Sequence, residues 1–131
     1  GTNSRLFNRL RKKYEGTPGV RITGYTRFIP LYMDSADLFL TKPGGISVTE
    51  ASAKALPMAF VNAVAGCEQY NMDYFIRHGF AFTRPSVKEL ATACVAALRG
   101  ETRLGEMRRD LQSHAWPNGA KRVFAELESS K

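Results

Sequence analysis

Two adjacent glycines, Gly44 and Gly45, stand between an apolar run and a helical pattern of small residues. Glycine lets an anion approach backbone N–H groups closely, and the amino end of a helix adds partial positive charge. Ser47 and Thr49 offer hydroxyl donors in the same segment. The pattern can therefore hold the diphosphate of a ligand, or it can simply turn the chain from strand to helix. It lacks the Gly-Lys-Ser/Thr ending of a P-loop and the G-x-G-x-x-G spacing.

Glu50 also has two interpretations. Ser47 and Glu50 have the spacing of a capping box, which by itself favours a role in starting the helix. A carboxylate one turn into this helix could instead bind the two hydroxyls of a ribose whose diphosphate lies on the helix end.

Polar side chains open the next helical pattern as well. Glu68, Gln69 and Asn71 come after a later apolar run. Carboxylate and amide groups pair with neighbouring hydroxyls, so these residues suit a ligand with several hydroxyl groups. Helix capping and pairing with the helix dipole are the alternative.

The elements that must position these residues follow from the apolar periodicity. Apolar residues at helical spacing predict a helix over about residues 3–15. Helical patterns alternate with short apolar runs, which predicts an α/β fold with a parallel sheet of about four strands. The runs that read as buried strands are Val20–Gly24, Asp37–Thr41, Met58–Asn62 and Phe80–Thr83.

The rest of the chain is predicted to be a helical tail. Ser86 and Glu89 form a capping box for a helix that ends at Gly100. A second helix covers about residues 102–114, and a break over residues 116–119 precedes a last one. The inner faces of the first and last of these helices are expected to carry Leu90, Ala91, Cys94, Val95 and Leu98, and Val123, Phe124 and Leu127.

Composition limits the class of protein. The 131 residues are one domain's worth of chain, residues 1–131, with 44% apolar residues. No apolar run is long enough to span a bilayer, and the first residues lack the apolar core of a signal peptide. Cys67 and Cys94 have no metal-like spacing, which favours reduced thiols in a cytoplasmic protein. The net charge of +7 could attract a phosphorylated ligand or anionic lipid, whereas no basic–aromatic stacking platform for nucleic acid is present.

Several motifs together resemble one family. They are Asp37–Gly45, Thr49–Ala51, Ala55–Pro57 and Gly66-x-Glu68-x-x-Asn71. They resemble the carboxyl-terminal domain of the processive diacylglycerol glycosyltransferases and monogalactosyldiacylglycerol synthases. More distantly, they are similar to the enzyme that adds N-acetylglucosamine to the peptidoglycan lipid precursor. The similarity covers roughly residues 1–83 and is most specific between Lys42 and Asn71.

The resemblance implies a fold and a donor site. The family has the GT-B fold, two Rossmann-like domains, of which the carboxyl-terminal one binds the nucleotide-sugar donor, here expected to be a UDP-sugar. The sequence shows no metal-binding cluster, so no metal ion or other cofactor is expected. By position, the resemblance assigns residues to four parts of the donor: Gly44, Gly45, Ser47 and Thr49 to the diphosphate, Glu50 to the ribose, Glu68, Gln69 and Asn71 to the sugar, and Tyr25 and Thr26 to the uracil.

Two features depart from the family pattern. Cys67 stands where the family has Gln, and a thiol is a poor hydrogen-bond partner, although Gln69 could supply an amide. A non-catalytic nucleotide-sugar binding module is therefore an alternative. The family's amino-terminal domain, which carries the catalytic residues and the lipid site, and the first strands of the carboxyl-terminal domain are absent, so we expect a partial domain.

The resemblance also implies the reaction and the partners. We expect a donor-binding part of an inverting hexosyltransferase with a lipid acceptor such as diacylglycerol, peripheral on the cytoplasmic membrane face. An acceptor of the peptidoglycan-precursor type is the alternative, and the charge alone leaves a basic interaction domain open. The missing strands would leave the Asp37–Thr41 strand with an open edge. That edge can pair with Val20–Gly24 or be buried in a homodimer, which is the expected outcome.

Overall fold

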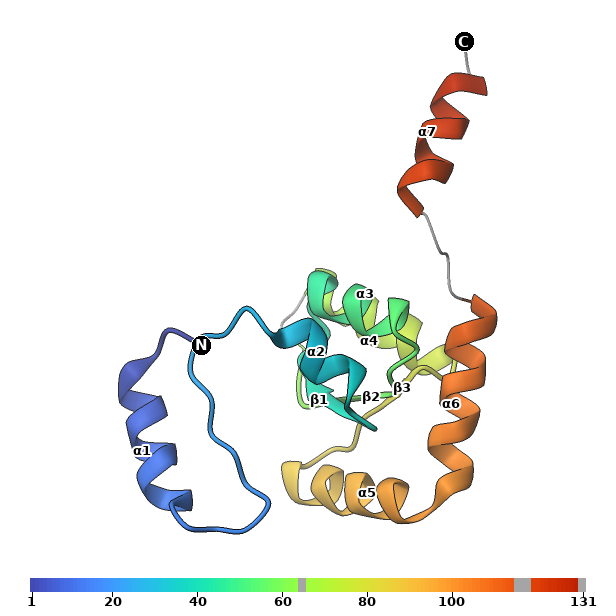
Figure 1. Ribbon diagram of the computed structural model, residues 1–131. Coiled ribbons are helices and arrows are strands. Elements are labelled where there is room, and N and C mark those ends of the chain that lie inside the picture. Colours follow the sequence, from blue (N-terminus) through green and yellow to red (C-terminus); the bar gives the residue numbers. More distant parts are fainter. Residues whose placement is uncertain (64–65, 115–118, 130–131) are drawn as a thin grey trace. The chain divides into compact units, whose positions relative to one another are not determined.

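The computed structural model describes residues 1–63, 66–114 and 119–129, with the backbone alone for residues 101 and 119–123 (Figure 1). The chain divides into two compact units, Gly1–Tyr32 and Met33–Lys131. Helix α1, Ser4–Tyr14, forms the first part of the first unit and confirms the helix predicted there. Asn3 caps it, because its side-chain oxygen accepts a hydrogen bond from the N–H of Leu6 at 2.9 Å.

The strand predicted at Val20–Gly24 is wrong. Residues 20–24 have no regular secondary structure, and the described sheet contains three strands where about four were expected. A strand needs a hydrogen-bonded neighbour, and within the described residues none lies beside this segment. Its apolar side chains are used differently: Ile22 is half-buried, and the ring of Phe7 lies 3.8 Å from the place where a Cβ of Gly24 would stand.

The second unit contains the sheet. Strands β1 (Phe39–Thr41), β2 (Met58–Phe60) and β3 (Ala81–Phe82) run parallel in the order β1-β2-β3. Phe39 lies opposite Met58, and Ala59 lies opposite Phe82. Three of the four predicted strands and the α/β class are therefore confirmed.

Helices connect and cover these strands. Helix α3, Gly45–Ala53, joins β1 to β2, and helix α4, Cys67–Arg77, joins β2 to β3. Figure 1 shows both helices on one side of the sheet and α5, Val87–Arg99, on the other side. The remaining helices are α2 (Ile29–Asp34), α6 (Glu101–His114) and α7 (Gly119–Ser129).

The core lies on both faces of β2. Met58 and Phe60 belong to the cluster that also contains Val48 of α3, while Ala59 between them belongs to the cluster with Leu90 of α5. Alternate residues of a strand point to opposite faces, so a strand buried on both sides must be apolar throughout. The segment Met58–Phe60 meets this requirement, and all three of its residues are fully buried.

The predicted inner face of α5 is partly wrong. Leu90 is buried and Cys94 is half-buried as expected, but Ala91, Val95 and Leu98 are exposed. The buried face runs instead through Leu90, Ala93, Cys94 and Ala97, because these residues lie on the side of the helix that contacts the sheet. On α7, Phe124 and Leu127 are exposed, and the break predicted at 116–119 lies mostly outside the described residues.

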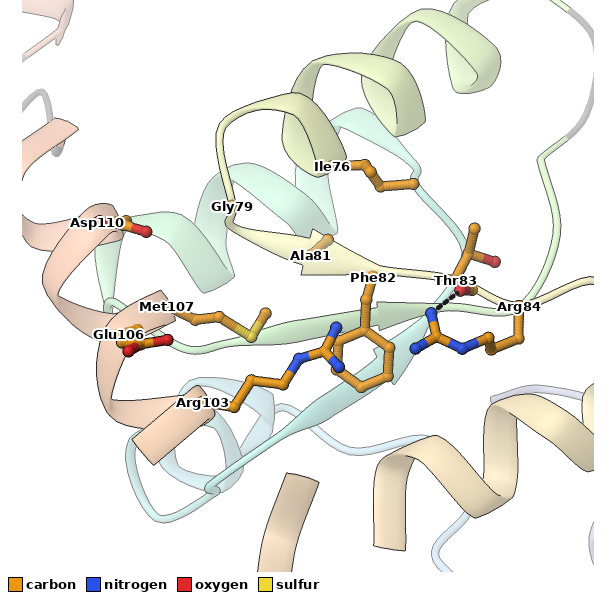
Figure 2. Close-up of a pocket in the computed structure, with 10 residues that line it drawn as sticks. All are labelled: Ile76, Gly79, Ala81, Phe82, Thr83, Arg84, Arg103, Glu106, Met107 and Asp110. Carbon is orange, nitrogen blue, oxygen red and sulfur yellow. Dashed lines mark hydrogen bonds between the residues drawn. The ribbon is translucent and has the colours of Figure 1, made fainter. Parts of the chain in front are cut away.

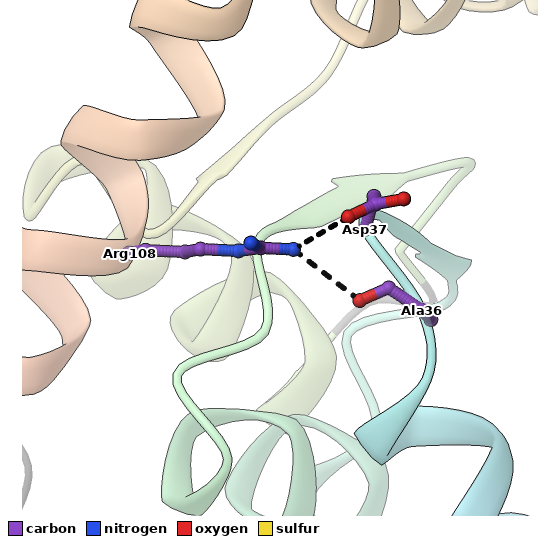
Figure 3. Close-up of polar contacts among 3 residues, drawn as sticks. All are labelled: Ala36, Asp37 and Arg108. Atoms are coloured by element: carbon purple, nitrogen blue, oxygen red, sulfur yellow. Dashed lines mark hydrogen bonds and ion pairs between the residues drawn. The ribbon is translucent and has the colours of Figure 1, made fainter.

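One ion pair ties α6 to the start of β1. The Nη2 atom of Arg108 lies 2.9 Å from Asp37 Oδ1 and 3.4 Å from the carbonyl oxygen of Ala36 (Figure 3). This contact precedes β1, whereas the glycines follow it. The opposite, carboxyl end of the strand is left to the Gly44 segment.

Candidate functional site

The glycine segment lies at the carboxyl end of β1, where ligands bind in open parallel sheets (Figure 1). The chain turns at Pro43, which is fully buried, and the N–H of Gly44 donates to the carbonyl oxygen of Lys42 at 2.8 Å. Helix α3 then begins at Gly45. We call residues 42–45 the glycine loop.

The amino end of α3 is not capped by a side chain. Its N-cap residue is Gly44, with φ −74° and ψ 133°. Within the described part of the chain, the N–H groups of Gly45, Ile46 and Ser47 have no hydrogen-bond acceptor. These three donors carry the positive end of the helix dipole and are open to an anion.

Neither glycine of the loop is required by the fold. Positive φ angles occur at Gly16, Gly19, Gly66 and Gly79 but not at Gly44 or Gly45. A Cβ at Gly44 would meet nothing within 4 Å, and one at Gly45 would meet only the Asn71 amide nitrogen at 3.9 Å. A Cβ would therefore fit at both positions, and packing does not explain the two glycines.

The capping box predicted for Ser47 and Glu50 is wrong. The helix starts at Gly45, so Ser47 is already its third residue and cannot act as the N-cap. Glu50 is exposed, and no hydrogen bond or ion pair of its carboxylate occurs among the described residues. Thr49 is engaged within the helix, because its hydroxyl donates to the carbonyl oxygen of Gly45 at 2.7 Å. Glu50 therefore has no role in capping α3, which was the alternative to ribose binding.

Helix α4 begins at the carboxyl end of β2 and contacts α3. Its N-cap is Gly66, with φ 96° and ψ −130°, a conformation that L side chains rarely adopt. Cys67 is exposed and Glu68 is half-buried in the first turn. The amide nitrogen of Gln69 donates to Asp73 Oδ1 at 2.9 Å, so this amide is held within α4.

Asn71 connects the two helix ends. Its amide nitrogen donates to the carbonyl oxygen of Pro43 at 2.9 Å. The sequence motif placed Asn71 near the glycine loop, but it gave no sign that the side chain bonds the loop itself. Pro43 was likewise missed as the residue that turns the chain.

The structure thus brings the predicted diphosphate, ribose and sugar residues into adjacent βα connections of the second unit. Tyr25 and Thr26 belong to the first unit. Tyr25 is 79% exposed, and the Thr26 hydroxyl oxygen accepts from the N–H of Phe28 at 3.1 Å.

A separate cavity lies beside β3. It has a volume of about 380 Å³, and Figure 2 shows it between β3 and α6. The guanidinium of Arg103 lies over the ring of Phe82 at 4.5 Å, and Glu106 and Asp110 supply opposite charge nearby. None of the predicted site residues lines it, so its position argues neither for nor against the glycine loop.

Among the described residues no group of three metal-ligating side chains occurs. Both cysteines are free thiols, and burial raises the pKa of the Cys94 thiol. No helix in the described ranges combines the length and apolar character that a membrane span requires.

Comparison with known proteins gives one family. Residues 1–115 match the family described as glycosyl transferases group 1. The chain is 34% identical over 107 residues to the processive diacylglycerol beta-glucosyltransferases of Staphylococcus aureus strains Newman and USA300. The match covers 82% of this chain and 27% of each relative, so the chain spans about a quarter of their length.

A solved structure agrees at the level of the fold. The crystal structure of the glycotransferase of kitacinnamycin matches 86% of this chain and 30% of that chain, with a TM-score of 0.63 and 22% identity. It supports the parallel α/β architecture.

Proposed function

Because this chain belongs to the glycosyl transferases group 1 family, we propose that the amino end of α3 binds the diphosphate of a UDP-sugar donor. The observation that carries the proposal is the uncapped helix end, where two glycines that the fold does not require leave three N–H groups open. Backbone N–H groups and the helix dipole together favour a phosphate at such a position.

The other donor contacts follow the order of the chain. The Glu50 carboxylate binds the ribose hydroxyls from the exposed face of α3, where it has no other partner among the described residues. Glu68, Gln69 and Asn71 are the candidates for the donor sugar, and Tyr25 and Thr26 for the uracil. Ser47 and Thr49 assist at the diphosphate, although the Thr49 hydroxyl already donates its proton to Gly45.

In the proposed reaction, an acceptor hydroxyl attacks the anomeric carbon of the donor sugar from the side opposite to UDP. The bond between the anomeric carbon and the diphosphate oxygen breaks, and its electron pair leaves on that oxygen. The α3 N–H groups stabilise this growing negative charge in place of a metal ion. The base that takes the acceptor proton is expected outside this chain.

The proposed acceptor is a membrane lipid such as diacylglycerol. This rests on the names of the matched relatives and, more weakly, on the basic last turn of α1, which contains Arg11, Lys12 and Lys13. The whole protein would then act on the cytoplasmic membrane face. Flotation with liposomes, with and without anionic lipid, is the direct check, and no association in either case would favour an acceptor in solution.

A non-catalytic nucleotide-sugar module is the second candidate. It is favoured by the first turn of α4, where Cys67 offers a thiol and the Gln69 nitrogen is already bonded to Asp73. Sugar transfer by the whole protein would exclude this candidate, while UDP-sugar binding without transfer would support it.

We also propose that the open edge of β1 is buried between two copies of the chain. β1 pairs with β2 alone in the described sheet, and Leu40 on β1 is 52% exposed. An apolar edge strand with unpaired backbone groups is prone to association. Sedimentation should show a dimer that Leu40→Lys weakens, and a monomer at high concentration would contradict it.

Calorimetric titration tests the donor site. We expect the protein to bind UDP more tightly than UMP and to bind uridine weakest, because the diphosphate makes the contacts with α3. Equal affinities for UDP and uridine, or no binding of UDP, would contradict the proposal.

A further inference from the structure

The peptide unit between Pro43 and Gly44 is hydrogen-bonded at both ends. Its carbonyl oxygen, on Pro43, accepts from the Asn71 amide nitrogen at 2.9 Å. Its N–H, on Gly44, donates to the carbonyl oxygen of Lys42 at 2.8 Å. Two bonds on one peptide unit fix the orientation of its plane, because rotation of the plane would break both.

The next N–H along the chain is the first free donor of α3. The carbonyl oxygen of Gly44 accepts from Val48 at 3.1 Å, while the N–H of Gly45 stays without an acceptor among the described residues. The direction of this N–H therefore depends on the fixed peptide unit before it and on the helix after it. Asn71 is the one side chain among the described residues that bonds the loop from outside α3.

The position of Asn71 makes this bond a link between two elements. Asn71 lies in α4, 28 residues from Pro43 in the sequence. Its side chain is half-buried, and Pro43 is fully buried, so water competes poorly for the bond. Only the nitrogen of the Asn71 amide can face a carbonyl oxygen, which leaves the amide oxygen turned away from Pro43.

We propose that Asn71 is a positioning residue for the diphosphate site, beside any contact that its amide oxygen makes with the donor sugar. It acts through the Pro43 carbonyl group and holds the free N–H of Gly45 in the direction that an anion requires. This inference rests on the proposed function, and it gives Asn71 a role in binding the UDP part of the donor.

The test compares UDP with UDP-glucose on the whole protein. UDP has no sugar, so loss of the bond in Asn71→Ala should weaken the binding of UDP about 3- to 10-fold, and that of UDP-glucose by at least the same factor. Asn71→Asp should weaken the binding of both further, because its carboxylate would face the Pro43 carbonyl oxygen and lie near the diphosphate. Gln112→Ala is the control, since it removes an exposed amide from α6, which carries none of the proposed site residues; its affinity for UDP should not change.

Amide spectra separate positioning from general loss of structure. In ligand-free Asn71→Ala, the N–H signals of Gly44 and Gly45 should move while those of Ala81 and Phe82 in β3 stay in place. If the variant does not fold, the side-chain amide signals of Asn71 in the wild type serve instead. They should respond to UDP, which has no sugar.

The outcomes are distinct. Weaker binding of UDP-glucose with unchanged affinity for UDP in Asn71→Ala, or Asn71 signals that respond to UDP-glucose alone, would overturn this inference and leave Asn71 as a contact of the sugar alone. A wild-type protein that binds neither ligand would overturn the proposed function itself.

Discussion

The amino ends of α3 and α4 occupy the same place in successive βα connections, yet they differ in chemistry. Neither end has a side-chain cap, and the α3 end also has no acidic residue in its first turn. The α4 end has Glu68 in its first turn and begins at a glycine with φ 96°. A carboxylate already complements the dipole of α4, whereas the dipole of α3 is left for a ligand. Topology places both helix ends at the candidate site, and under the proposed function the first-turn residues decide which one receives the anion.

The largest expected effect comes from an acid placed on the α3 end. Gly44→Asp should lower UDP affinity by roughly 100-fold or more, because two charges about 4 Å apart at a partly exposed site repel by up to ~4 kcal/mol. Aspartate is also a good N-cap, and Gly44 has an extended conformation that accepts it. The melting temperature should therefore stay the same or rise while binding is lost.

Gly44→Asn is the matched control for that variant. It offers a cap of the same size without charge, so it should keep more of the UDP affinity than Gly44→Asp. Calorimetry with both variants at equal salt makes the comparison. Wild-type affinity in Gly44→Asp would show that the anion binds elsewhere.

The next effect distinguishes two motifs with the same sequence spacing. Glu50→Ala should weaken UDP binding by about 1–3 kcal/mol, the cost of losing a charge-assisted hydrogen bond. Its stability should change by less than about 0.5 kcal/mol, because Glu50 caps nothing.

Glu89→Ala should lower the stability and leave the UDP affinity unchanged. Glu89 does belong to a capping motif: the Ser86 hydroxyl oxygen accepts from its N–H at 3.2 Å and donates to its carboxylate at 2.8 Å. Loss of the Glu89 side chain should lower the free energy of unfolding by about 0.5–1 kcal/mol without a change in the affinity for UDP. Chemical denaturation and calorimetry on both variants check the pair, and equal UDP affinity in wild type and Glu50→Ala would remove Glu50 from the site.

A third comparison concerns one glycine at each helix end, Gly66 at α4 and Gly45 at α3. Gly66→Ala should destabilise the protein by about 1–3 kcal/mol, because an L residue is strained at the positive φ of this position. Gly45→Ala should stabilise it by about 0.5–1 kcal/mol, since Gly45 lies in a helix with room for a Cβ. Urea unfolding measures both, and a destabilised Gly45→Ala would mean that the fold, not a ligand, requires that glycine.

The smallest expected effect is a gain in UDP-glucose affinity from a substitution at the amino end of α4. Cys67→Gln places an amide in the first turn of α4, where the exposed thiol now stands. We expect about 2- to 10-fold tighter binding of UDP-glucose and no change for UDP, the gain of one hydrogen bond. A similar gain for UDP alone would show that position 67 contacts the diphosphate part instead.

Much of the fold could be predicted because burial imposes its own pattern. The run Met58–Phe60 has to be apolar on both faces of the sheet, and it was found as a strand. The Val20–Gly24 run also carries β-branched apolar residues, but it has no described neighbour to pair with, so the local sequence alone does not predict its structure correctly. On α5 the helix itself is predicted correctly, but the predicted buried face differs from the observed one. The sequence does not show which side of a helix contacts the sheet.

The candidate site could also be predicted only in part. The double glycine and Glu50 could be singled out from spacing, but the competing capping box was excluded only when α3 was seen to begin at Gly45. The bond from Asn71 to Pro43 joins α4 to the glycine loop, 28 residues away in the sequence, and no local pattern encodes such a contact. Spacing identifies candidates, while the start of a helix and its long-range bonds assign their roles.

The most direct measurement is a titration of UDP into the ¹⁵N-labelled protein, followed at each backbone amide. We expect the largest shifts at Gly45, Ile46 and Ser47, whose N–H groups are open, and a smaller one at Gly44, whose N–H already donates to Lys42. Shifts confined to the first turn of α4 or to the cavity beside β3, or no shifts at saturating UDP, would contradict it.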